Sequence, residues 1–410
     1  MIKRVAGNAF FLSLSQIIAR GIGFFYFIFL ARSLGVNIFG IYCFTLSFIY
    51  NFYPVADFGL ERLILRDISR ESENCQYYFS RLLPLRILLS VISIILALLL
   101  GLLLGQSNKQ LLYFFLFGLT IFPYNLIFLL TSFQNAKEKM RYSAVIAILS
   151  ILFSVVFGTI FVNLHFSLSW ILLSFFFGNT ALLLILLKSL KKIGIELKIV
   201  IDFPFWKKSL SQSWVFAVLL IISVFYLRLS VILVGLIKDS YSVGIYSSGY
   251  KFIEALILLP QSLALALFPL SSRMIIDNKE KLKKIYLKGL AVLFLFSLPV
   301  FLIFQIFPTI IINLSYGDKF IEASSLFPVF GVAVILFFVN SLSGNIIQNS
   351  TYVQKFIPAA ILNFIISLIL LIILIPRYSL LGAAWGVVFS EIAGFFINNY
   401  FVFKIFKRRD

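Results

Sequence analysis

Ionisable side chains interrupt several of the long apolar runs in this 410-residue chain. Placing a charge at the centre of a membrane costs at least ~2.5–3.5 kcal/mol, so such residues normally face protein, a partner or water. Arginine and lysine at such places suit an anionic ligand such as phosphate or pyrophosphate. The candidates for a cationic binding site are Arg20, Arg86, Arg228 and Lys251, and the candidate acids are Glu254, Glu391 and Asp57.

Three of the basic candidates are predicted to lie deep in the membrane. Arg20 is about 12 residues into the first apolar run, or roughly 18 Å along a helix. Arg228 and Lys251 are similarly far from the ends of their runs. A side chain near the bilayer centre does not easily reach the headgroups, so these three residues are expected to line a cavity.

Two other candidates lie near the ends of apolar runs. Arg86 is about one turn inside its run and is expected to extend toward the cytoplasmic headgroups. Asp57 lies at an edge beside Arg62, which favours a helix cap or a surface ion pair. We nevertheless keep both residues as candidates, Arg86 for substrate binding and Asp57 for ion coupling.

Lys251 and Glu254 stand at positions i and i+3, so both fall on one face of a helix and can pair. One interpretation is a self-contained pair that only offsets the cost of burial. The other is that Lys251 meets the substrate and that Glu254 is its resting partner. The residues at 247–250 are Ser, Ser, Gly and Tyr, which predicts that this face is the wall of a wet cavity.

The composition is that of a membrane protein. Hydrophobic residues make up 61% of the chain and charged residues 12%, whereas soluble domains are about half apolar and about a quarter charged. Continuous apolar runs of about 18 residues or more predict an all-α polytopic fold rather than a barrel. We expect about 12 transmembrane helices, at 8–31, 36–57, 82–104, 110–133, 142–163, 166–187, 210–236, 241–270, 286–306, 324–346, 354–375 and 380–403.

The net charge of +19 is unevenly distributed along this plan. Most Lys and Arg residues fall in segments that are cytoplasmic if both termini are cytoplasmic, as the positive-inside rule requires. This asymmetry accounts for the charge without nucleic acid, and the basic face would contact anionic membrane lipids. The first span is predicted to be retained as an anchor rather than cleaved as a signal peptide.

A short repeat suggests that the chain is duplicated. Gly-Ile-Tyr occurs at 40–42 and again at 244–246, almost half the chain apart. Two halves of six spans would share one orientation, as in a parallel repeat. The predicted domains are an N-terminal bundle at 1–187, a cytoplasmic linker at 188–208 and a C-terminal bundle at 209–410. Two such halves would enclose a central cavity and work by alternating access.

Sequence signatures of catalysis are missing. The chain has no phosphate-binding loop, no HExxH and no GxSxG with partners. Cys43 and Cys75 form no disulfide or metal pattern, and His165 is expected to be an ordinary loop residue. We therefore predict no catalytic residue, no metal and no enzyme. A membrane polysaccharide polymerase would be expected to have a larger outside loop than segment 307–323, where Asp318 and Glu322 are the acids.

Five stretches together resemble a known family, the polysaccharide-biosynthesis (Wzx-type) flippases of the multidrug/oligosaccharidyl-lipid/polysaccharide exporter superfamily. They are LARSLGVNIFGIY (30–42), DFGLERLILRDISR (57–70), VGIYSSGYKFIEALILLPQSLALALFPLSSRM (243–274), LSYGDKF (314–320) and LGAAWGVVFSE (381–391). The resemblance implies two six-helix bundles around a central cavity, the MATE-like fold. It also implies a multi-pass protein of the bacterial inner membrane.

The resemblance further implies a substrate. The family moves undecaprenyl-pyrophosphate-linked oligosaccharide from the cytoplasmic to the periplasmic leaflet for O-antigen or capsule biosynthesis. A polysaccharide polymerase and chain-length machinery would be partners. Relatives carry basic cavity residues on spans 1 and 8, where Arg20 and Lys251 fall. Relatives often have Asp beside Arg in span 7, but this chain has Tyr226-Leu227-Arg228, which leaves Glu254 and Glu391 for proton or sodium coupling.

Two alternatives stay open at this point. A multidrug or cation antiporter of the same superfamily would favour acidic residues in its cavity, whereas the membrane interior here has a basic surplus. A scaffold for polysaccharide-assembly enzymes would tolerate changes in the cavity but not in the loops.

Overall fold

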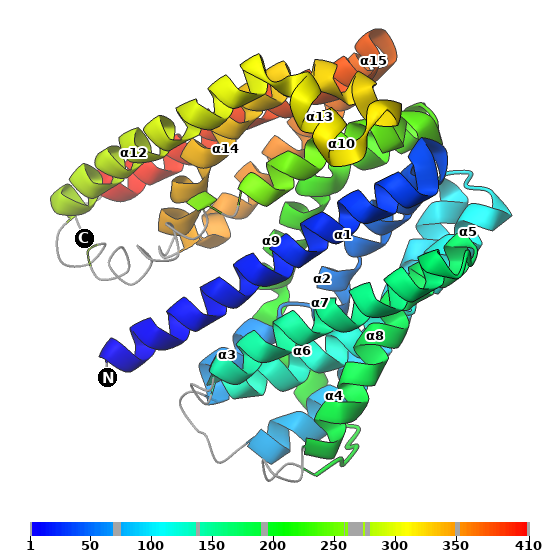
Figure 1. Ribbon diagram of the computed structural model, residues 1–410. Helices are drawn as coiled ribbons and strands as arrows, with labels where there is room; N and C mark the ends of the chain where they lie inside the picture. Colours follow the sequence, from blue (N-terminus) through cyan, green and yellow to red (C-terminus); the bar gives the residue numbers. More distant parts are fainter. Residues whose placement is uncertain are drawn as a thin grey trace. The chain divides into compact units, whose positions relative to one another are not determined.

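The structure is a computed structural model that describes residues 2–68, 75–136, 140–189, 196–257, 259–260, 274, 279–348 and 353–407. Within those ranges it is almost entirely helical and contains no strand, which confirms the predicted all-α polytopic fold (Figure 1). Parts of three predicted features lie outside the described residues: positions 190–195 of the linker, most of 258–278 after Lys251, and the four residues 349–352 before the last pair of spans.

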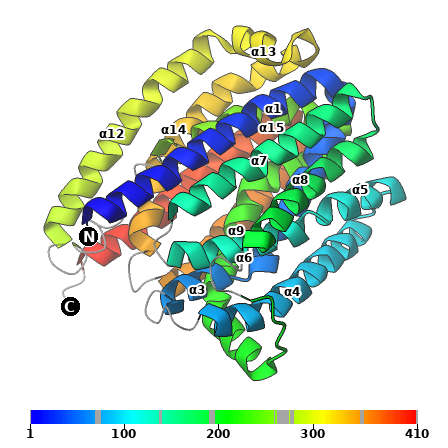
Figure 2. The same ribbon diagram turned by 60° about the horizontal axis from the view of Figure 1, so that its bottom comes forward.

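The helices are numbered in chain order, and Figures 1 and 2 label them. They are α1 (Ile2–Tyr50), α2 (Tyr53–Asp57), α3 (Leu60–Ile68), α4 (Cys75–Leu103), α5 (Asn108–Gly118), α6 (Ile121–Ala136), α7 (Met140–Asn163), α8 (Leu168–Ser189), α9 (Phe203–Ile237), α10 (Ser240–Leu256), α12 (Lys279–Ile306), α13 (Pro308–Tyr316), the 3₁₀ helix η3 (Asp318–Leu326), α14 (Phe327–Gln348) and α15 (Val353–Lys407).

Nine helical segments of the described chain are long and apolar enough to cross a membrane. The longest, Leu14–Ile68, covers most of the predicted span 8–31 and all of 36–57, and Gln354–Lys407 contains the last two predicted spans. Their turns lie where the predicted spans meet, at Gly35 (φ 71°) in α1 and at Ser379 (φ 52°) in α15. Both residues leave the helical region of backbone space, so each long helix is divided into two arms.

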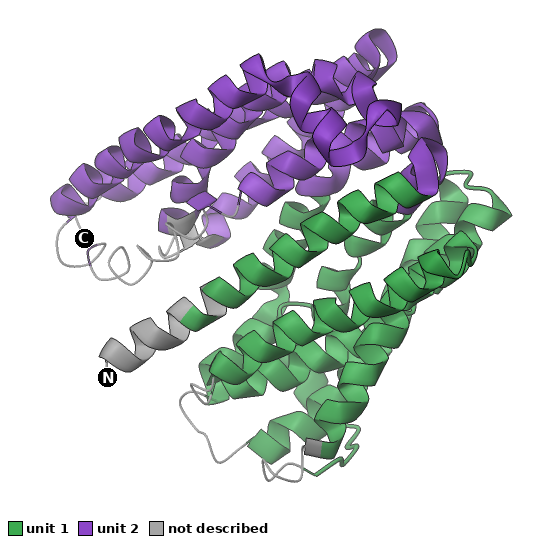
Figure 3. Cartoon of the chain, in the orientation of Figure 1, with its two compact units in different colours: residues 1–33, 45–225 green, residues 34–44, 226–410 purple. Residues whose placement is uncertain are grey.

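The chain divides into two compact units (Figure 3). Unit 1 comprises residues 1–33 and 45–225, and unit 2 comprises residues 34–44 and 226–410. The helix α9 therefore contributes to both units, as does α1. The division into six-span halves joined by a linker at 188–208 stays a prediction, because a division by packing need not follow the order of the spans.

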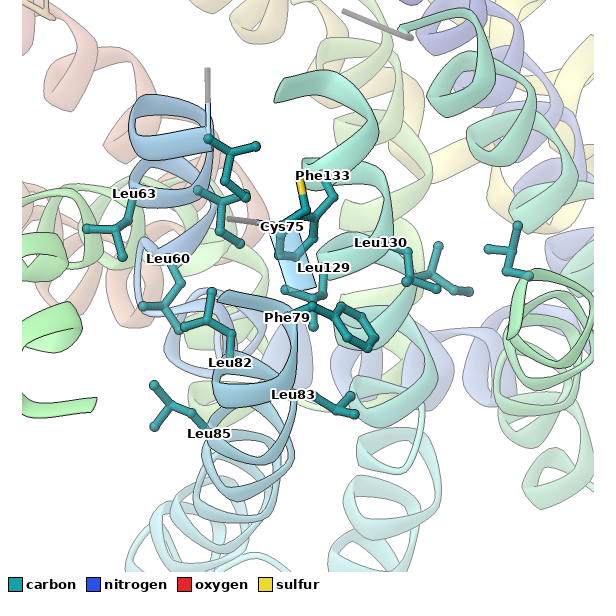
Figure 4. Close-up of a cluster of buried hydrophobic side chains, with 14 of the residues drawn as sticks. Leu60, Leu63, Cys75, Phe79, Leu82, Leu83, Leu85, Leu129, Leu130 and Phe133 are labelled. Carbon is teal, nitrogen blue, oxygen red and sulfur yellow. The ribbon is translucent and has the colours of Figure 1, made fainter. Parts of the chain in front are cut away.

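The core of unit 1 includes a buried apolar cluster where α3, α4 and α6 meet (Figure 4). Leu60 of α3, Leu82 of α4 and Leu129 of α6 are completely buried there, and Phe79 packs edge-on against Phe133. Burying one such apolar side chain away from water stabilises a fold by roughly 1.5–3 kcal/mol. Where the surroundings are lipid instead of water, van der Waals packing between the helices provides the stabilisation. This packing fixes the ends of α3 and α4 next to the polar groups described below.

Unit 2 is built around α14, which packs against α12 and α15 (Figures 1 and 2). A buried hydrogen-bond network ties the three helices together. The hydroxyl group of Tyr286 lies 2.8 Å from the Ser343 hydroxyl oxygen and donates to Asn399 Oδ1 at 2.7 Å. Polar contacts of this kind join helices in an apolar environment, where an unpaired polar group is costly.

The two copies of Gly-Ile-Tyr meet within unit 2. A Cβ atom on Gly40 would overlap the carbonyl oxygen of Ser240, and one on Gly244 would overlap the carbonyl oxygen of Val36. Only glycine allows two helix backbones to approach this closely. The repeat that the sequence shows therefore has a structural function: the matching glycines let segment 34–44 cross α10.

Candidate functional site

A charged cluster in unit 2 joins α9 and α10. Glu254 Oε2 lies 2.8 Å from Lys251 Nζ, and Glu254 Oε1 lies 3.1 Å from Arg228 Nη1. The predicted i, i+3 pair is thus confirmed, and the structure adds Arg228, whose approach to Glu254 the sequence spacing did not indicate. The three side chains are 21–25% exposed, so the cluster is accessible at its edge.

The cluster carries a surplus of positive charge. One carboxylate is shared by two cations, and each of its oxygen atoms holds a different one. The geometry is fixed by Tyr250, whose hydroxyl donates to the carbonyl oxygen of Leu227 at 3.0 Å and so ties α10 to α9. Two convergent cations held apart in this way are a suitable site for an anion with several oxygen atoms, such as a phosphate.

The prediction that residues 247–250 form the wall of a wet cavity is wrong. Ser248 is completely buried, and its hydroxyl donates to the carbonyl oxygen of Ile245. Tyr250 is also buried, and a Cβ atom on Gly249 would lie 2.9 Å from the ring of Phe330. The small residues serve close packing of α10 against α14, which is a common use of small residues between helices in membranes.

A second group in unit 2 surrounds Glu391 of α15. Its carboxylate is almost completely buried and accepts hydrogen bonds from the Tyr226 hydroxyl at 2.7 Å and from Asn340 Nδ2 at 2.7 Å. Asn340 Nδ2 also donates to the backbone carbonyl oxygen of Glu391 at 2.9 Å. Among the described residues, no cation pairs with this carboxylate.

Sequence reasoning missed Tyr226 and Asn340. In the sequence Tyr226 is conspicuous only because relatives often have Asp in this part of span 7. Asn340 lies in an apolar run that gives no sign of a polar partner. Because a hydroxyl group can donate to a carboxylate or accept from a carboxylic acid, Tyr226 can pair with Glu391 in either protonation state. The oxygen of the Asn340 side chain is buried and accepts no hydrogen bond within the part of the chain that the structure describes.

A third cluster lies in unit 1, around Arg86. This side chain is completely buried, with Nη2 2.6 Å from Asp57 Oδ1 and Nη1 donating to Asn125 Oδ1 at 2.6 Å. The prediction that Arg86 extends to the headgroups is therefore wrong, and so is the surface or capping role of Asp57. Both expectations judged depth from the sequence alone, and they failed because the two opposite charges neutralise each other inside the unit.

Asn125 completes the network around Arg86. Its Nδ2 group donates to Ala56 O at 3.0 Å and to Ser90 Oγ at 2.9 Å. The helical structure is interrupted between α2 and α3 at Phe58 and Gly59, whose φ angles are both positive. Irregular backbone at membrane depth must be satisfied by protein or water. Asn125 supplies a fixed partner to the Ala56 carbonyl oxygen just before this break. Substrate binding by Arg86 stays a prediction.

The remaining predicted residue, Arg20, lies on α1 in unit 1 with an exposed side chain. The structure thus brings together Arg228, Lys251 and Glu254, and separately Arg86 and Asp57. It places Glu391 with neutral partners. Joint action of Arg20 and Lys251 on one ligand stays a prediction. Clusters of three His, Cys, Asp or Glu side chains that could hold a metal ion do not occur among the described residues.

Comparison with known proteins decides the family. The model for polysaccharide biosynthesis proteins matches residues 5–275. The chain belongs to this family. No match was found among curated protein sequences.

Solved structures similar to this member of the polysaccharide biosynthesis family include transport proteins. The lipid II flippase MurJ, in an inward closed conformation, has a TM-score of 0.76 at 18% identity, over 96% of this chain and 88% of MurJ. An inward-facing multidrug resistance MATE transporter has a TM-score of 0.71 at 14% identity, over 97% of this chain and 96% of the transporter. An outward-facing MATE transporter has a TM-score of 0.67 at 14% identity, over 98% and 97%. The polysaccharide biosynthesis protein therefore has the fold of this transporter superfamily.

Proposed function

We propose that this protein is a flippase that moves undecaprenyl-pyrophosphate-linked oligosaccharide from the cytoplasmic to the periplasmic leaflet of the bacterial inner membrane. Family membership and the flippase-like fold support the class of protein. The observation that carries the substrate assignment is the cluster in which Arg228 and Lys251 share Glu254. A pyrophosphate has oxygen atoms for both cations, whereas most drugs exported by multidrug transporters are cationic.

The proposed binding step is an exchange of anions. The pyrophosphate takes the place of the Glu254 carboxylate between Lys251 and Arg228, so no uncompensated cation is exposed before the substrate arrives. Arg20 of unit 1 is proposed to bind the same headgroup during transport. Alternating access of the two units then carries the headgroup across, with the polyprenyl chain in the lipid.

Glu391 is the proposed coupling residue. A buried carboxylate with neutral partners can take up a proton, because the Tyr226 hydroxyl can bond either form. It can also bind a sodium ion together with the unused oxygen of Asn340. Either event would change the charge held inside unit 2 and so bias its conformation.

The first experiment tests substrate binding in cells that depend on this protein for surface polysaccharide. Arg20→Ala and Lys251→Ala are each expected to abolish surface polysaccharide at normal protein levels, because the pyrophosphate loses a cation. Lys251→Arg is expected to retain much of it. Lys109→Ala, an exposed lysine outside the clusters, is the matched control and should have no effect. Normal polysaccharide in both alanine variants would refute the proposed site.

The second experiment tests the role of Glu254. In Glu254→Gln the cations no longer face a competing carboxylate, so inorganic pyrophosphate should bind to the purified protein several-fold more tightly. Calorimetric titration measures this affinity, and Glu322→Gln, on an exposed acid of η3, serves as the control. Equal affinity in Glu254→Gln and in the unaltered protein would return Glu254 to a purely structural role.

A second candidate function is a multidrug or cation antiporter. It is favoured by one observation, the buried Glu391 without a cationic partner among the described residues, because a cation-binding transporter needs such an acid. Overexpression in a drug-sensitive strain distinguishes the two functions. The antiporter requires drug resistance that is lost in Glu391→Gln, whereas the flippase predicts none.

A further inference from the structure

The non-helical segment that leads into α9, residues 196–202, carries a row of exposed apolar side chains. Leu197, Ile199 and Ile201 are 56%, 66% and 64% exposed, Glu196 and Lys198 are exposed as well, and Val200 and Asp202 are partly buried. Phe203, the first residue of α9, continues the exposed row and is 70% exposed. We call residues 196–203 the strap.

The strap is held firmly against the first turns of α4. Gln76 makes two hydrogen bonds to the backbone of Glu196, at 2.8 and 3.0 Å, and the Val200 N–H donates to Ser80 O at 3.0 Å. Asp202 Oδ2 lies 2.7 Å from Arg81 Nε. These contacts use backbone groups of Glu196 and Val200 and the side chain of Asp202, and the four apolar side chains of the strap stay exposed.

The strap lies at one end of two long apolar helices. It joins the N-terminal ends of α4 and α9, both of which are long and apolar enough to cross a membrane. Tyr77, in the first turn of α4, and Phe203 are exposed aromatic residues at these helix ends, and such residues are common where spans meet the headgroups. Lys207 and Lys208 follow directly on α9 and are exposed, while Glu196 and Asp202 are each engaged by a basic side chain.

We propose that the strap is a lipid-binding element that lies in the headgroup region of the anionic cytoplasmic leaflet. The apolar side chains of Leu197, Ile199, Ile201 and Phe203 insert between acyl chains, and Lys207 and Lys208 bind headgroup phosphates. Charge complementarity favours an anionic bilayer over a protein partner, since the acids beside the row are already paired. This inference does not depend on which substrate the protein transports.

Spin labels on the strap test this inference in the full-length protein reconstituted into phosphatidylglycerol vesicles. Labels are placed at Ile199→Cys and Ile201→Cys, with Lys198→Cys as the matched control on the strap. Cys43 and Cys75 are buried, so the unsubstituted chain serves as the blank. Collision with oxygen, which partitions into lipid, should exceed collision with a water-soluble nickel complex at 199 and 201, and the order should reverse at 198.

Two outcomes would overturn the proposal. Equal exposure to the nickel complex at 198, 199 and 201 would show a strap in water, and protection from both reagents at 199 and 201 would show a protein cover, such as a second copy of this chain.

The role of headgroup charge is tested with the same labelled proteins. The labels should lie several-fold less exposed to nickel in phosphatidylglycerol than in phosphatidylcholine, and Lys207→Gln with Lys208→Gln should remove that difference. An unchanged difference would refute the role of the two lysines.

Discussion

At the scale of single residues, buried charges in this protein follow two patterns. Arg86 is completely buried and shares its charge with Asp57, whereas Glu254 is partly exposed and shares its charge with two cations. The first arrangement pairs one positive with one negative charge and includes a hydrogen bond from Arg86 to Asn125. The second keeps a positive surplus at an accessible edge, which is why the proposed function rests on it.

The neutral pair leads to a stability prediction. Asp57→Ala leaves the Arg86 charge buried without a counter-ion, which should destabilise unit 1 by about 3–5 kcal/mol. Thermal unfolding of the detergent-solubilised protein measures the change. Asp318→Ala, on an exposed acid of η3, is the control and should stay within about 0.5 kcal/mol of the parent.

A double substitution separates charge from packing. Asp57→Leu combined with Arg86→Met removes both charges at similar volume, and it should recover much of the lost stability, since buried ion pairs are often replaceable by apolar residues. If the double variant were as unstable as Asp57→Ala, the cost would come from lost packing around the break between α2 and α3.

At the scale of elements, the glycines of the repeat determine a helix crossing. Segment 34–44 and α10 approach so closely at Gly40 and Gly244 that a methyl group on either would overlap a backbone carbonyl oxygen of the other element. Backbone atoms do not move aside as a flexible side chain does. The crossing therefore depends on glycine at both positions.

Gly244→Ala should therefore destabilise the protein by about 1–3 kcal/mol, because the new methyl group forces the two helices apart. Gly21→Ala is a matched control within a helix, since nothing lies within 4 Å of the added methyl group. That change should be neutral or stabilising by up to about 1 kcal/mol, because alanine favours the helix. Equal thermal stability of the two variants would contradict the close crossing.

The strap provides an element-scale prediction about pH. The pKa of Asp202 is lowered, first by the hydrogen bond from Arg81 and then by the Phe205 backbone N–H. A depressed carboxyl pKa adds stability above the unfolded value of about 3.9, and this is lost as the pH falls through the folded pKa. A spin label at Val200→Cys should therefore become more mobile below about pH 4. Asp202→Asn should remove this dependence and show a mobile label at neutral pH.

At the scale of the whole molecule, the chain is a multi-pass membrane protein of two compact units, and its polypeptide passes between them within α1 and within α9. A helix shared between units is a means of transmitting motion, because its arms are covalently continuous. Gly35, next to the change of unit in α1, has a backbone conformation that interrupts the helix. The proposed transport cycle requires such points of articulation.

The sequence by itself determined the class of fold and the order of the spans. Apolar runs long enough to cross a bilayer are a property of local composition, and turns at Gly35 and Ser379 lie where the predicted spans meet. The motif resemblance likewise indicated the family that the comparison showed. The pairing of Lys251 with Glu254 was predictable because helix geometry brings positions i and i+3 together.

Only the tertiary structure decided which charges share a site. Arg228 meets Glu254, Arg86 meets Asp57, and Tyr226 meets Glu391 across separations of 26, 29 and 165 residues, and no helical period relates such positions. Depth in a span also did not reveal burial, because burial depends on which neighbouring helix covers the side chain. Local periodicity fixes what a helix presents on each face, whereas packing against helices distant in the sequence fixes what that face meets.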